Sequence, residues 1–128
     1  MTGDGLPGAP HDGPGGVVRT PLGAGEAEER LGRLGWDAAL VSDGATKAAF
    51  LDTVASVLRF PAYFGHNLDA LWDCLNELPG PTALVWEGWQ RMAVETPDDW
   101  AGVIDVLSER ARDARAPFAL VLVEGARR

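Results

Sequence analysis

Residues 67–86 read NLDALWDCLNELPGPTALVW, and this stretch decides the fold class. Its first part, 67–78, places leucines and a tryptophan three and four residues apart, which predicts an amphipathic helix with Asn67 as its N-cap. The Pro-Gly-Pro sequence at 79–81 then ends the helix. The second part, 82–86, is almost wholly apolar and predicts a strand that is covered on both faces. A helix followed by a buried strand indicates an α/β protein.

The same patterns continue on both sides of this stretch. They predict strands at 36–41 and 118–123, helices at 46–58 and 96–114, and an irregular segment or short helix at 88–95. Strands joined by helical crossovers usually lie parallel. We therefore expect a three-stranded parallel sheet packed with helices, mainly on one face, with loops or a helix shielding the other face.

The N-terminal part of the chain has a different composition. Residues 1–25 contain eight glycines and four prolines and almost no large apolar side chain, so they offer little surface to offset the entropy of ordering. Residues 24–34 could form a short charged helix that ends at Gly35. We expect 1–35 to be a mostly disordered, flexible extension and 36–128 to be the folded domain.

The chain is acidic, with a formal net charge of −8. Residues 60–113 hold ten acidic and three basic side chains, so this segment accounts for most of the excess. Such a surface repels nucleic acids and anionic lipids and favours cationic partners, although acidity that serves only solubility remains an alternative. The apolar runs are too short to cross a membrane. With Cys74 as the only cysteine and no secretory leader visible, we expect a cytoplasmic protein.

The predicted helix at 67–78 has a distinctive polar side. Asp69, Asp73 and Asn76 share one arc beside the apolar stripe, and Trp72 lies at the border. Two like charges four residues apart destabilise an isolated helix by a few tenths of a kcal/mol. The pattern fits either a solvated polar face or a rigid pair of carboxylates that meets cations.

An enzyme would need a nucleophile, a base and a cleft. Of the two histidines, His11 lies in the N-terminal extension and His66 at a helix entry. Cys74 is expected to be half buried and inert. Asp69 and Asp73 could act as an acid–base pair, but nothing in the sequence supplies a cleft. No Cys/His spacing suggests a metal site. We expect no enzymatic activity, catalytic residue, metal or cofactor.

Residues 60–75, FPAYFGHNLDALWDCL, resemble the barstar family, the intracellular inhibitors of barnase-type ribonucleases. The resemblance extends more loosely over 36–123. It implies a small α/β domain whose helix and preceding loop block the active site of a secreted, guanyl-specific ribonuclease. The partner would be that extracellular ribonuclease, and the free inhibitor would be a monomer.

The resemblance also implies roles for individual residues. Asp73 is similar to the carboxylate that occupies the nuclease's phosphate pocket, and Asp69 to its neighbour. Tyr63 is similar to the aromatic residue that packs on the catalytic histidine. Glu109 and Asp113 match acids at the rim of the interface. The implied partner-binding residues are Tyr63, Gly65, Asn67, Asp69, Trp72, Asp73, Asn76, Glu109 and Asp113.

The chain departs from the family pattern at four positions. Phe64 replaces a tyrosine, His66 an acid, Asn76 a threonine and Leu78 a tryptophan. Asn76 and Leu78 lie at the binding edge, and the four changes bear on the identity of the nuclease more than on the mode of binding. They leave open an alternative function, an immunity or adaptor protein of the same fold that acts on a different toxin or basic partner.

Overall fold

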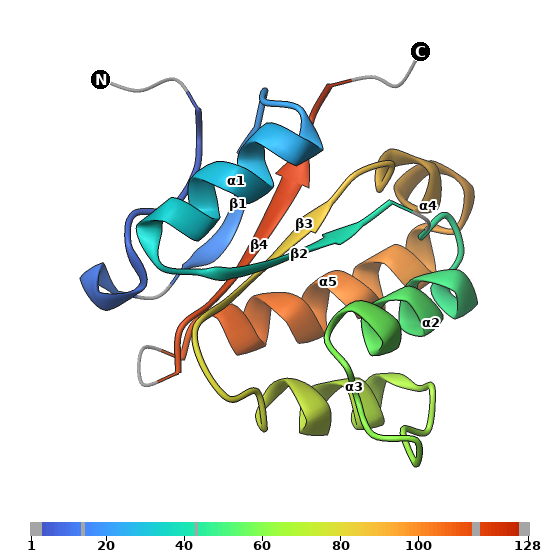
Figure 1. The fold of residues 1–128 in the computed structure, drawn as a ribbon. Coiled ribbons are helices and arrows are strands. Elements are labelled where there is room, and N and C mark those ends of the chain that lie inside the picture. The colour runs from blue at the N-terminus through green and yellow to red at the C-terminus, as the bar shows by residue number, and fades with distance from the viewer. Residues whose placement is uncertain (1–3, 14, 43, 114–115, 126–128) are drawn as a thin grey trace.

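The computed structural model describes residues 4–13, 15–42, 44–113 and 116–125. At its centre lies a parallel sheet with the strand order β1-β4-β3-β2 (Figure 1). Its strands are β1 (Gly16–Thr20), β2 (Asp37–Val41), β3 (Thr82–Trp86) and β4 (Phe118–Val123). Every residue of β3 and β4 is buried, so the predicted strand covered on both faces is confirmed.

The helices lie close to where the sequence predicts them. They are α1 (Ala24–Leu34), α2 (Lys47–Val57), α3 (Leu68–Leu75), α4 (Gln90–Glu95) and α5 (Pro97–Ala111), with a short 3-10 turn η1 (Pro10–Asp12). Both α3 and α5 end three residues earlier than expected. After α3 the backbone tightens, because the amides of Glu77 and Leu78 donate to carbonyls three residues back, 3.1 and 3.4 Å away.

The N-terminal segment corrects two expectations. Among residues 4–13 and 15–35, β1 pairs in parallel with β4, so the sheet has four strands rather than three. The helix α1 covers the face of the sheet opposite α2, α3 and α5 (Figure 1). This described part of 1–35 is therefore not the disordered extension that its composition suggested.

Glycine explains why composition misled. A Cβ atom on Gly15 would lie 2.5 Å from the Cβ of Ala119 in β4, so only glycine allows this close approach. Gly16, the first residue of β1, has φ +72°, a conformation that other residues rarely adopt. Gly15 therefore serves close packing against β4, and Gly16 serves the backbone conformation at the start of β1.

The sheet separates two apolar cores. The larger one lies under α2, α3, α4 and α5 and includes Phe50, Leu71, Trp86 and Leu107, all fully buried. The smaller one lies under α1 and includes Leu31. No helix within the described part of the chain is long and apolar enough to span a membrane.

Candidate protein-binding surface

Helix α3 packs against the larger core and leaves one side to solvent. Its N-terminus is capped by Asn67, whose side-chain oxygen accepts a hydrogen bond from the Ala70 amide at 2.8 Å. Leu71, Cys74 and Leu75 are buried and anchor the helix. The remaining face is therefore held at a fixed position on the domain.

That open face presents the two predicted carboxylates. Asp69 and Asp73 are exposed and lie one helical turn apart. Within residues 4–13, 15–42, 44–113 and 116–125, neither carboxylate has an ion pair or a hydrogen bond. Burial raises the pKa of the neighbouring Cys74 thiol, and the charges of Glu77 and Asp73 raise it further. The surface thus combines two acids that lack ion pairs among the described residues with a buried thiol on the same helix.

Two aromatic side chains are exposed on α3 and on the loop that precedes it. Tyr63 is 82% exposed, and Trp72 is 37% exposed. The loop that carries Tyr63 is anchored by Phe64, which is buried and packs on Phe60 with ring centroids 5.1 Å apart. Phe64, which departs from the family pattern, also packs on the His66 ring with centroids 4.7 Å apart.

The chain enters α3 through a tightly bonded turn. His66 has φ +53°, and its ring contacts the Phe64 carbonyl at 3.0 Å through Nδ1 and the Asp52 carboxylate at 3.1 Å through Nε2. The side-chain amide of Asn67 donates to the Gly65 carbonyl at 3.3 Å. These contacts connect the loop to α2 and set its direction at the start of α3.

A groove separates α3 from α5. It has a volume of about 240 Å³ and is lined by Leu68, Asp69, Trp72, Asp105, Val106 and Glu109. At one end the helices approach closely, because a Cβ on Gly102 would lie 3.0 Å from Leu68. Asp105 is not among the binding residues that the sequence predicts. Its place beside Asp69 depends on how two helices pack, which spacing along one helix does not reveal.

The remaining predicted residues lie around this groove or beyond the helix ends. Glu109 is exposed and forms an ion pair with Arg112 at 2.5 Å. Asp113 follows the end of α5, is partly buried, and its charge raises the pKa of Arg110. Asn76 is the exposed C-cap of α3, whereas Leu78 packs against the core.

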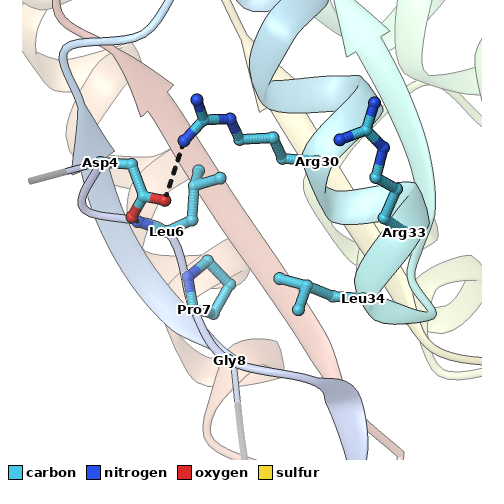
Figure 2. A pocket seen from close by; sticks show the side chains of 7 residues that line it. All are labelled: Asp4, Leu6, Pro7, Gly8, Arg30, Arg33 and Leu34. Atoms are coloured by element: carbon cyan, nitrogen blue, oxygen red, sulfur yellow. Dashed lines mark hydrogen bonds and ion pairs between the residues drawn. The ribbon is translucent and has the colours of Figure 1, made fainter. Parts of the chain in front are cut away.

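A second cavity lies on the other side of the sheet (Figure 2). It has a volume of about 500 Å³ and is lined by Asp4, Leu6, Pro7, Gly8, Arg30, Arg33 and Leu34. Its charges are already matched: Arg30 contacts Asp4 at 3.5 Å and Glu26 at 2.8 Å, and Arg33 contacts Glu29 at 2.9 Å. This cavity contains none of the predicted binding residues.

Comparison with known proteins identifies the family. The family model described as "Barstar (barnase inhibitor)" matches residues 40–123. A curated Bacillus subtilis (strain 168) protein, "Putative ribonuclease inhibitor YrdF", is 31% identical over 72 residues, which cover 56% of this chain and 79% of that protein. The matched region includes the loop at Tyr63, α3 and α5. The chain therefore belongs to the barstar family.

Proposed function

We propose that this protein is an inhibitor that blocks the active site of a secreted, barnase-like ribonuclease. The observation that supports this most directly is the pair of exposed acids on α3, Asp69 and Asp73, which lack partners among the described residues. Trp72 shares their helix, and Tyr63 is exposed on the loop before it. The matching family model is described as "Barstar (barnase inhibitor)".

The chemistry of the surface suits such a target. A ribonuclease holds phosphate with cationic side chains, and a carboxylate can replace the phosphate and accept two hydrogen bonds from arginine. Helix α3 holds Asp69 and Asp73 on a rigid, capped element, so little conformational entropy is lost on binding. Tyr63 and Trp72 provide the large aromatic contacts that are enriched at the energetic centres of interfaces.

The negative charge around α3 should speed the association of this protein with a basic nuclease. Asp105 and Glu109 add acidic groups along the groove beside α3, and the chain carries a net charge of −8. A field of this sign attracts a basic nuclease and raises the association rate. The single cysteine fits action in a reducing cytoplasm, where an inhibitor would protect the cell that makes the nuclease.

The test is inhibition of RNA cleavage across a panel of guanyl-specific ribonucleases. We expect stoichiometric inhibition of at least one enzyme, and we expect guanosine 3′-monophosphate to compete with the inhibitor because both occupy the phosphate site. Binding without competition would contradict the active-site mechanism. If no ribonuclease binds and a different basic toxin does, the immunity or adaptor function on the same fold replaces this proposal. The departures at Asn76 and Leu78 are the features that favour that second function.

A further inference from the structure

Arg110, in the last turn of α5, stands apart from the other charged side chains. It is 1% exposed, and no other charged residue within the described ranges is buried. Burial lowers its pKa, while the negative charge of Asp113 raises it. A guanidinium remains charged in proteins, so the molecule encloses a cation where an apolar residue would usually lie.

Backbone carbonyls from two other parts of the fold surround this cation. Nε donates to the Leu75 carbonyl at 3.0 Å, and Nη1 donates to the Ala116 carbonyl at 2.6 Å. The guanidinium also lies over the ring of Phe118, 5.4 Å from its centroid. Arg110 therefore joins the end of α3, the end of α5 and the start of β4.

The bond to Leu75 matters for α3 in particular. Leu75 is the last residue of that helix, where carbonyls lack partners within the helix and carry partial negative charge. The Leu78 amide also donates to this carbonyl, but over a longer distance of 3.4 Å. Of these two hydrogen bonds to the Leu75 carbonyl, the one from the charged Arg110 side chain is therefore the shorter and the stronger.

The two helices that Arg110 joins carry the carboxylates of the proposed interface. Asp73 lies two residues before Leu75, and Glu109 directly precedes Arg110. At the other end of the helix pair, the close approach at Gly102 and Leu68 already fixes the separation. In addition to the buried side chains of α3, Arg110 supplies a polar contact between the helices at the end opposite this close approach.

We propose that Arg110 is a positioning residue that holds the C-terminal end of α3 on α5, so that Asp73 and Glu109 are presented to the partner at a fixed separation. The inference rests on the proposed function for its binding consequence. Its structural consequence, a fixed end of α3, concerns the free protein alone.

The first experiment measures amide hydrogen exchange in the free Arg110→Met protein. We expect exchange at residues 74–78 to become about tenfold faster, while the strands β3 and β4 keep their protection. Arg91→Met is the matched control: it removes the same charge from an exposed arginine on α4 whose one ion-pair partner among the described residues is Glu95. Unchanged exchange at 74–78, or an equal acceleration in all elements, would overturn the proposal.

A second variant guards against loss of folding. Arg110→Lys keeps the charge but has no planar fork to reach both carbonyls. We expect it to fold and to leave exchange at 74–78 about threefold faster than in the unmodified protein. Full restoration of protection by lysine would show that charge alone suffices and would contradict positioning through two bonds.

A binding experiment addresses the consequence for the interface. Against an inhibited ribonuclease, Arg110→Met should speed dissociation about tenfold in the unmodified background and in Tyr63→Ala, but much less in Asp73→Ala, because the carboxylate that it positions is then absent. An equal acceleration of dissociation in the Tyr63→Ala and Asp73→Ala backgrounds would overturn the positioning of Asp73. If the unmodified protein binds no ribonuclease, the proposed function fails, whereas the exchange experiment still decides the role of Arg110.

Discussion

The two helical faces of the sheet treat their acids in opposite ways. On α1, two of the three glutamates form ion pairs with arginines four residues later, Glu26 with Arg30 and Glu29 with Arg33. On α3, Asp69 and Asp73 find no such partner in the part of the chain that the structure describes. Acids that form ion pairs within their own helix need no partner from another molecule. Acids left open beside exposed aromatic side chains mark a face suited to another molecule.

The sharpest test of this difference is removal of one acid from each face. Asp73→Ala should weaken ribonuclease binding by about 2–5 kcal/mol, because the partner's buried cations lose their counter-charge. Some of the charge-pair energies on which this range is based belong to the same protein family. The free energy of unfolding should change little, since Asp73 is exposed. Isothermal titration and urea unfolding measure the two quantities.

The matched control for that variant is Glu29→Ala on α1, which removes the same charge from the opposite face. It should leave the affinity nearly unchanged and cost only the few tenths of a kcal/mol of its ion pair with Arg33. Equal losses of affinity in both variants would show that overall charge, rather than the α3 surface, governs binding.

A second comparison concerns stability. Leu31 on α1 is fully buried in the smaller core, so Leu31→Ala should lower the free energy of unfolding by about 2–5 kcal/mol. The affinity of the folded fraction for the ribonuclease should remain, because α1 lies across the sheet from α3. Leu34→Ala, at a position 40% exposed, serves as the control and should cost far less. A negligible loss for Leu31→Ala would mean that α1 does not support the fold as described.

Salt should slow association with the ribonuclease through the acidic surface that includes α3. Raising the ionic strength from about 0.05 to 0.5 M should slow association with the ribonuclease by roughly tenfold, because exposed acids are screened. The dissociation rate should change much less, since contacts in the formed interface exclude ions. Stopped-flow fluorescence would follow both rates. An association rate that ignores salt would exclude steering by the acidic surface.

The last prediction concerns Cys74, a residue outside the proposed binding surface. Burial and the nearby acids raise the pKa of its thiol, so a smaller fraction is thiolate at neutral pH and attack on thiol reagents is slow. We expect labelling in the folded protein to be at least about tenfold slower than in urea, and to accelerate as the pH rises. Rapid labelling at neutral pH would mean that the end of α3 opens more readily than its packing indicates.

Local patterns predicted much of the fold. The strands at 82–86 and 118–123 and the helix at 24–34 have the predicted bounds, because continuous apolar runs and the punctuation by Pro and Gly are local signals. The strand β1 escaped prediction. It is five residues long, and its partner β4 lies about a hundred residues away in the sequence, so nothing near Gly16 indicates the pairing.

The candidate site shows the same division. The exposure of Asp69, Asp73 and Tyr63 agrees with helical spacing and the family motif. Asp105 and Arg110 could not be identified from the sequence, since their places depend on the packing of α3 against α5. On one helix, Asp105 looks like any solvated acid, and Arg110 looks like an ordinary surface cation of a last turn.

The position of β4 has a consequence for how the protein is made. This strand is synthesised after the other three, yet it lies between β1 and β3 in the sheet. Until residues 118–123 leave the ribosome, β1 has no neighbour to bond with, and the two apolar layers on either side of the sheet stay open to the chaperones that bind nascent chains. The four-stranded sheet is therefore complete only after β4 has been synthesised, in one late step that places this strand between β1 and β3.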